Sequence, residues 1–285
     1  MIEDPLPGLS TPVRVTAYDA AECRERVDEL ATEEPLEIRL LAGGKMQSIA
    51  VTMRTPGNDF ELAAGFLLAE NIVARREDIA ELSYCVDPAI DRDQRYNIVN
   101  VTLAGGSLPN VERLERHFTM TSACGICGKA TLESLHTRSE PIDDDVRFDM
   151  ATLMVFSDRM RSAQRVFAST GGLHAAALFD EAGNLLVVRE DVGRHNALDK
   201  AIGWALLHRR IPLRRCAAVV SGRASYELVQ KSIMARLPVL CAVSAPSSLA
   251  VALAAEFNLT LVGFLRPPRA NAYAGLQRLG LKKNS

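Results

Sequence analysis

The chain has 285 residues, of which 48% are hydrophobic and 24% charged, and its formal net charge is −2. This balance is typical of a folded globular protein and excludes a wholly disordered, collagen-like or low-complexity chain. The length allows one large domain or two of ordinary size.

The first half of the chain predicts a small α+β domain. Alternating apolar patterns predict strands at residues 13–18, 36–41, 47–53, 79–86 and 96–102, the first three in one antiparallel sheet. A hairpin turn is expected at residues 42–45, after a loose lead-in at residues 1–12. Helices are expected at residues 59–69, capped by Asn58, and at residues 110–118.

The second half alternates strands with helices of about ten residues, which predicts a layered, partly parallel α/β domain. Strands are expected at residues 167–179, 185–189, 217–220, 239–243 and 259–264. Helices are expected at residues 196–207, 226–235 and 249–257. A polar connector at residues 140–145 predicts a division into domains at 1–140 and 141–285.

The net charge hides an asymmetry between the two ends of the chain. Residues 206–285 carry twelve Lys and Arg but only two acids, whereas the remainder is acidic. Such a basic segment is typical of a solvated surface or of a site for a polyanion. Nucleic acid is not favoured as that polyanion, because the basic residues are scattered and aromatic residues for base stacking are few.

No targeting or membrane segment is expected. The most apolar stretch, residues 237–257, is interrupted by two prolines and three serines, so it does not predict a membrane span. The first residues have neither a basic start nor an apolar run, so they do not resemble a secretory signal. We therefore expect a cytoplasmic protein.

Only two of the six cysteines are close in sequence, Cys124 and Cys127 in a Cys-Gly-Ile-Cys segment. Such a pair is compatible with a zinc site, a thioredoxin-like disulfide, plain structural cysteines or a thiol that carries sulfur. A structural zinc site needs four ligands, and the chain has no second pair, so no metal is expected. Gly125 and Gly128 make the segment flexible, which suits a sulfur that moves between two partners.

Three segments of the second half place small or polar residues between a strand and a helix. They lie at residues 189–196, 221–225 and 244–248. Helix N-termini bind phosphate well, and the carboxyl ends of strands in an open α/β sheet are where ligands bind. Capping explains Ser225 and Ser247 equally well, but Arg194 and Arg223 oppose the helix dipole and are harder to explain as caps.

Two further segments carry residues suited to ligand binding. Gly172 and His174 follow a glycine turn, where a ligand can approach the backbone closely. Residues 263–269 end the last predicted strand with an aromatic residue and two arginines. Motifs for a phosphate-binding P-loop, a dinucleotide-binding glycine loop and a zinc deaminase are absent from the sequence.

Together these segments resemble the FdhD family, the formate dehydrogenase accessory sulfurtransferases. The matching stretches are SACGICGK at 122–129, TGGLH at 170–174, EDVGRHNALDK at 190–200, SGR at 221–223 and GFLR at 263–266. The resemblance implies a homodimer that takes sulfur from a cysteine desulfurase and transfers it to the molybdenum bis(molybdopterin guanine dinucleotide) cofactor of formate dehydrogenase. It also implies a cytidine-deaminase-like fold for the C-terminal α/β domain.

The resemblance implies the site residues as well. Cys124 would bear the persulfide, with Cys127 as its partner. The expected cofactor contacts are Gly172, His174, Arg194, His195, Gly222, Arg223, Phe264, Leu265, Arg266, Pro267, Pro268 and Arg269, and GDP would be a partial mimic of the cofactor. Pro267 and Pro268 depart from the glycine-containing loop expected in the family.

Two other functions remain open from the sequence. One is a nucleotide-binding protein with a Cys124–Cys127 redox switch. The other is a chaperone that holds the cofactor without sulfur chemistry.

Overall fold

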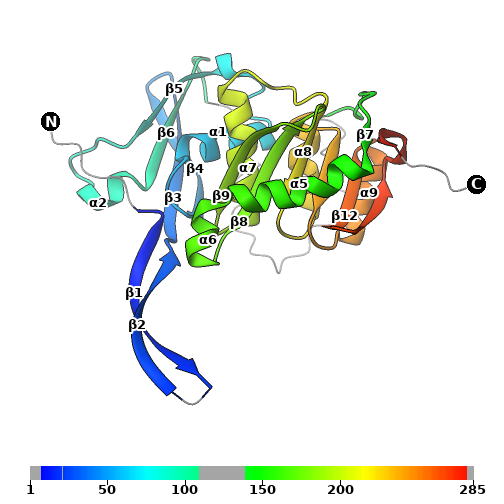
Figure 1. Cartoon of the computed structure of the whole chain (residues 1–285). Helices are drawn as coiled ribbons and strands as arrows, with labels where there is room; N and C mark the ends of the chain where they lie inside the picture. Colours follow the sequence, from blue (N-terminus) through cyan, green and yellow to red (C-terminus); the bar gives the residue numbers. More distant parts are fainter. Residues whose placement is uncertain (1–7, 21, 109–138, 281–285) are drawn as a thin grey trace, which may run out of the picture.

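The computed structural model describes residues 8–20, 22–108 and 139–280 (Figure 1). The predicted helix at 110–118 and the Cys124–Cys127 segment lie outside these ranges. The first element is a two-stranded antiparallel ribbon, β1 (Ser10–Asp19) and β2 (Glu22–Ala31), which extends away from the rest of the molecule.

A four-stranded sheet follows, in the order β4-β3-β6-β5. Its strands are β3 (Glu34–Ala42), β4 (Lys45–Arg54), β5 (Ile79–Tyr84) and β6 (Ile98–Leu103). The intervening helical segments are α1 (Asp59–Ala69), η1 (Arg76–Asp78) and α2 (Arg92–Arg95).

The second sheet has six strands in the order β13-β12-β11-β10-β8-β9. These strands are β8 (His174–Asp180), β9 (Leu185–Asp191), β10 (Cys216–Val220), β11 (Val239–Ala242), β12 (Thr260–Arg266) and β13 (Arg269–Ala274). The three central strands β10, β11 and β12 are parallel, and the remaining pairings are antiparallel. The fold is therefore mixed α/β, as the sequence predicts.

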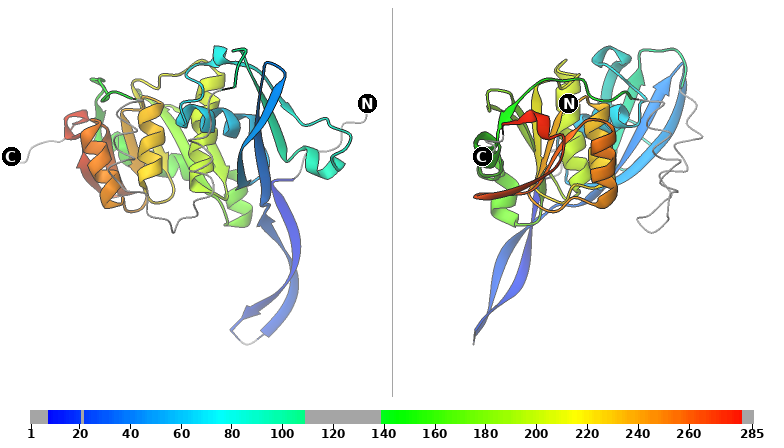
Figure 2. Two further views of the ribbon diagram at one scale, coloured as in Figure 1. Left: turned by 180° about the vertical axis from the view of Figure 1, so that it is seen from behind. Right: turned by 90° about the vertical axis from the view of Figure 1, so that its right-hand side faces the viewer.

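Helices cover both faces of this sheet (Figures 1 and 2). They are α5 (Met150–Ala163), α6 (Arg165–Thr170), α7 (Arg194–Leu207), α8 (Tyr226–Met234) and α9 (Ser248–Glu256). Two short strands, β7 (Phe148–Asp149) and β14 (Leu279–Gly280), pair with each other, and η2 (Leu276–Arg278) precedes the second of them.

The six-stranded sheet has a hydrophobic core on each face, and the direction of each strand side chain determines the core in which it packs. Ala177 and Phe179 of β8 pack in the core beneath α5, whereas Ala176 and Leu178 pack in the core beneath α7. Side chains alternate in direction along a strand, so a strand covered on both faces is a continuous apolar run. This explains why β10 and β11 are so uniformly aliphatic.

Buried Arg278 ties the connector before β7 to the second sheet. Its guanidinium donates hydrogen bonds to the backbone oxygens of Ile142, Asp144 and Asn258 at 2.7–3.2 Å. Burial lowers the pKa of Arg278 below its usual range. The carbonyl groups satisfy the guanidinium donors that would otherwise be buried without partners.

The structure differs from the sequence predictions in the ribbon and near α6. Residues 13–18 pair with β2 and not with the sheet of β3 and β4, and residues 10–12 belong to β1. The sequence does not predict strand β2, because most of its residues are charged or exposed and it lacks the apolar alternation of a half-buried strand. Residues 167–170 form the end of α6 rather than a strand, and helix α5 was not expected.

Most other elements agree with the predictions within a few residues. The hairpin turn at residues 42–45 joins β3 to β4, and α1 has the predicted bounds. Asn58 occupies the position before α1, but its side chain makes no capping hydrogen bond and its φ is 57°. No helix in the described ranges is long and apolar enough to span a membrane.

The two sheets share one hydrophobic core through the contact of α1 with α7. Two glycines make this contact possible. A Cβ added at Gly65 would lie 1.9 Å from the backbone oxygen of Asp199, and one at Gly203 would lie 1.8 Å from that of Glu61. The division at residue 140 remains a prediction, since this core runs across it.

Replacing either glycine with alanine should therefore separate α1 from α7. We expect Gly65→Ala and Gly203→Ala each to lower the free energy of unfolding by about 3 kcal/mol, because overpacking forces backbone displacement. Urea denaturation measures the change. Gly105→Ala is the control, since a Cβ there would meet no atom within 4 Å; equal stability of all three variants would contradict this account.

Candidate functional site

Two of the three predicted loops, residues 221–225 and 244–248, meet the segment at residues 263–269 at one edge of the six-stranded sheet. The parallel strands β10, β11 and β12 end there, and backbone hydrogen bonds join the segments that follow them. Ser244 N donates to Gly222 O at 3.4 Å, Ala224 N to Ala245 O at 3.2 Å and Phe264 N to Ser244 O at 3.1 Å. The structure thus brings residues 221–225, 244–248 and 264–266 side by side.

His174 joins the same edge because β8 runs antiparallel to β10. The Ser221 hydroxyl accepts a hydrogen bond from Ala175 N at 2.9 Å and lies 3.4 Å from His174 Nδ1. A Cβ added at Gly222 would contact both the His174 ring and Arg194 Cδ, at 3.4 and 3.5 Å. Gly222 therefore lets His174 and Arg194 approach the same backbone.

A buried carboxylate fixes the loop that carries Arg194 and His195. Asp191 is fully buried, and its Oδ2 lies 2.7 Å from Nζ of buried Lys200. The same carboxylate accepts hydrogen bonds from the backbone of Gly193 at 2.8 Å and of Thr55 at 3.2 Å. Each polar group is thereby satisfied, which a buried ion pair requires.

His195 lies at the first turn of α7 and faces α8. Its Nε2 is 3.1 Å from the Ser225 hydroxyl and 3.7 Å from the Glu227 carboxylate, and interaction with the imidazole lowers the pKa of Glu227 to about 2. Both partners contact the same ring nitrogen, so this is not the arrangement of a catalytic triad. Ser247 does cap α9, by accepting from Ala250 N at 3.2 Å.

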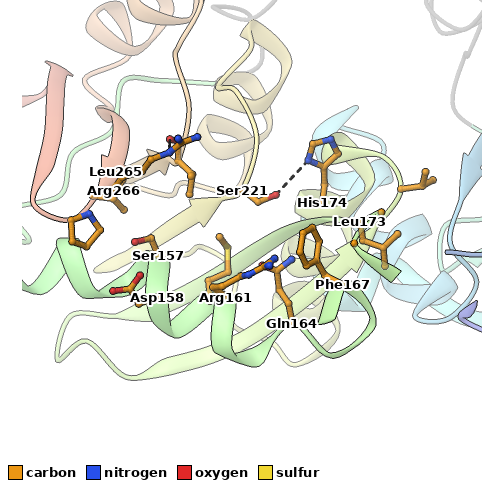
Figure 3. Close-up of a pocket in the computed structure, with 16 residues that line it drawn as sticks. Ser157, Asp158, Arg161, Gln164, Phe167, Leu173, His174, Ser221, Leu265 and Arg266 are labelled. Carbon is orange, nitrogen blue, oxygen red and sulfur yellow. Dashed lines mark hydrogen bonds between the residues drawn. The ribbon is translucent and has the colours of Figure 1, made fainter. Parts of the chain in front are cut away.

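A pocket of about 690 Å³ opens beside this edge (Figure 3). The expected cofactor contacts that line it are Gly172, His174, Leu265, Arg266 and Pro267. Its opposite wall is α5, which contributes Ser157, Asp158 and Arg161, followed by Gln164 and Phe167.

The remaining expected contacts lie around the pocket rather than in its lining. Arg223, Pro268 and Arg269 are exposed, and Phe264 is 43% exposed. Phe264 has a φ of 53°, and the pairing of β12 with β13 is irregular between Gly263 and Arg266. An aromatic residue with positive φ is a true outlier, and such strain is concentrated at functional sites.

The α5 wall was missed from the sequence. The apolar residues Leu153, Phe156 and Met160 recur at spacings of three and four and are all buried, which is a helical signal. Residues 167–170, which the sequence predicts as the start of a strand, instead form the end of α6. The carboxylate of Glu190, on β9, stabilises the start of α6. It accepts hydrogen bonds from Val166 N and Phe167 N at 3.1 and 2.8 Å.

The electrostatics of the site favour an anionic ligand. Two arginines, Arg161 and Arg266, line the pocket against one carboxylate, Asp158, and Arg194 Cδ lies against the backbone at Gly222. Arg194 Nε is buried and has no hydrogen-bond partner among the described residues. Within the same ranges no group of three or more His, Cys, Asp or Glu side chains is arranged to hold a metal ion.

The chain is similar to known proteins over most of its length. The sequence model of the FdhD/NarQ family matches residues 31–280. The chain is 53% identical to the sulfur carrier protein FdhD of Mycolicibacterium paratuberculosis, over 94% of this chain and 97% of that one. It is 54% identical to the protein of the same name from Streptomyces coelicolor, over 90% and 91% of the two chains.

The fold is also similar to a solved structure. The crystal structure of a protein from Desulfotalea psychrophila, described as a formate dehydrogenase accessory protein, superposes with a TM-score of 0.73 at 26% identity. The match covers 95% of this chain and all of that one.

Titration of His174 should make the fold sensitive to acid. Burial, and then the charges of Arg194 and His195, lower the pKa of His174 below its ordinary 6.5. The folded protein therefore prefers neutral His174, and its stabilising effect is complete above about pH 6.5 and is lost as the pH falls below that value. We expect His174→Asn to lose less stability than the wild type between about pH 7 and pH 5.

Urea midpoints at the two pH values measure this difference. His208→Asn is the control, because His208 is exposed. Parallel loss of stability in the wild type and in His174→Asn would exclude His174 as the acid-sensitive group.

Proposed function

Because the chain belongs to the FdhD/NarQ family, we propose that it is a sulfur carrier that serves formate dehydrogenase as an accessory protein. The observation that carries this proposal is the family match over residues 31–280, which includes the Cys124–Cys127 segment. The finer proposal is that sulfur comes from a cysteine desulfurase and goes to the molybdenum bis(molybdopterin guanine dinucleotide) cofactor, which is the substrate.

Sulfur loading is a thiol–persulfide exchange. The Cys124 thiolate attacks the outer sulfur of the desulfurase persulfide, a new S–S bond forms at Cys124, and the desulfurase cysteine leaves as a thiolate. Attack by Cys127 on the inner sulfur of the Cys124 persulfide then releases the outer sulfur as sulfide. The product is a Cys124–Cys127 disulfide, and a cellular dithiol reduces it before the next cycle.

The site at the sheet edge suits the substrate's chemistry. Each guanine dinucleotide carries a pyrophosphate, and arginines bind phosphate oxygens with charge-assisted, bidentate hydrogen bonds. Arg194, Arg223, Arg266 and Arg269 come from three different loops at this edge. GDP, which shares the nucleotide end of the cofactor, is the simplest probe of the site.

We assign residues 141–285 to a cytidine-deaminase-like α/β domain that holds the cofactor, and we expect two copies of the chain to form a homodimer. The cytoplasm is the expected location, because free thiols remain reduced there.

Peptide mass mapping after incubation with a cysteine desulfurase and cysteine tests sulfur loading. Cys127→Ala should gain one sulfur atom at Cys124, because loading needs only that thiolate. Cys124→Ala should gain little, and neither variant should activate formate dehydrogenase, since release needs both thiols. Cys85→Ala is the control, because Cys85 is buried and has no part in the transfer.

The same experiment separates the other two functions. A redox switch predicts no added sulfur in any variant, including Cys127→Ala, whereas a Cys124–Cys127 disulfide in the wild type is expected of both the switch and the carrier. A chaperone without sulfur chemistry predicts that formate dehydrogenase is activated when both cysteines are replaced. Sulfur on Cys127 at the wild-type level in Cys124→Ala would reverse the roles of the two cysteines.

A further inference from the structure

One wall of the pocket carries polar side chains that the proposed sulfur transfer does not use. Helix α5 and the turn after it contribute Asp158, Arg161 and Gln164, which lie on the opposite side of the pocket from Leu265 and Arg266 (Figure 3). None of the three lies in a stretch that carries the family resemblance. Their chemistry indicates what this wall binds.

Gln164 is the clearest sign of a ligand. The residue is only 4% exposed, it lines the pocket, and its Nε2 has no hydrogen-bond partner among the described residues. An unpaired buried amide is costly, and folded proteins keep few such groups. An apolar residue of the same size would fill the position at lower cost, so the amide is expected to bond to a bound molecule.

Arg161 supplies a flat surface. Its guanidinium carbon lies 3.7 Å from the centroid of the Phe167 ring, so the planar group is supported from one side by an aromatic residue. Guanidinium planes stack on aromatic rings and on nucleic-acid bases. Arg161 is otherwise exposed, so the face of its guanidinium away from Phe167 suits a planar heterocycle.

Asp158 supplies acceptors at the same wall. Its carboxylate forms no ion pair with any residue in the described ranges, although Arg161 follows three residues later on the same helix. A carboxylate accepts from two neighbouring N–H groups, and a glutamine amide donates to a carbonyl oxygen. The wall thus offers a donor, a pair of acceptors and a stacking plane.

We propose that the α5 wall recognises a guanine base: the ring stacks on Arg161, the Gln164 amide donates to O6, and Asp158 accepts from N1–H and the 2-amino group. Adenine has an amino group in place of O6 and no N1–H, so it would leave these protein groups unpaired. Gln164 is buried, and a site with a buried polar group rejects an analogue that leaves that group unpaired. This assignment rests on the proposed function, because it gives the guanine end of the cofactor its binding surface.

Titration calorimetry on the full chain with GDP, IDP and ADP tests the assignment. The wild type should bind GDP more tightly than ADP. Gln164→Leu should weaken GDP binding about threefold to tenfold and leave ADP unchanged, because one hydrogen bond to O6 is lost. Its melting temperature should not fall, since leucine removes the unpaired amide.

Asp158→Asn tests the other edge of the base. IDP lacks the 2-amino group, so wild-type protein should prefer GDP to IDP, and this preference should fall about tenfold in the variant. The matched controls are Gln230→Leu on α8 and Asp19→Asn on β1, neither of which lines the pocket. Both controls should bind GDP as the wild type does.

The outcomes separate this inference from the proposed function. Unchanged GDP binding in Gln164→Leu and Asp158→Asn, with normal sulfur loading on Cys124, would overturn the α5 assignment and leave the carrier function standing. Equal wild-type affinity for GDP and ADP would overturn it as well. If the wild-type protein took up no sulfur from the desulfurase, the carrier function itself would be contradicted.

Discussion

The buried ion pair of Asp191 and Lys200 is the interaction on which the site depends. Asp191 ends β9 and Lys200 lies in α7, and their charged atoms are 2.7 Å apart with almost no exposure to solvent. Lys200 also donates to the backbone oxygen of Thr55 at 2.8 Å, and Asp191 accepts from Thr55 N. One pair of charges therefore joins the loop after β4 in the first half to the loop and helix that carry Arg194 and His195.

Further contacts between the two halves of the chain accompany this ion pair. Helix α1 packs on α7 at Gly65 and Gly203, and Glu61 of α1 forms an ion pair with Arg189 of β9. Removing one charge of a buried pair is far more destabilising than replacing both, because the remaining charge has no partner. The first sheet thus acts as a support for the ligand-binding edge of the second.

The sequence predicted the parts of the fold that depend on local periodicity. The alternation of strands and helices from residue 185 to 266 predicted the layered α/β domain, and the loops at its strand ends do meet at one edge. The sequence did not predict α6, because its first turn is capped by Glu190 from a strand that follows it in the chain. The sequence also did not predict β2, the strand that pairs with β1, because an exposed ribbon needs no apolar pattern. The α5 wall could not be assigned to the pocket before the sheet order was known.

The most direct test of this account is the variant Lys200→Met, examined for stability and for GDP affinity together. The account predicts that the free energy of unfolding falls by about 3–5 kcal/mol, because Asp191 is left as an unpaired buried charge. GDP affinity should fall with it, and the double variant Asp191→Asn/Lys200→Met should recover part of the stability. A Lys200→Met protein with wild-type stability and wild-type GDP affinity would show that the buried pair does not hold the site.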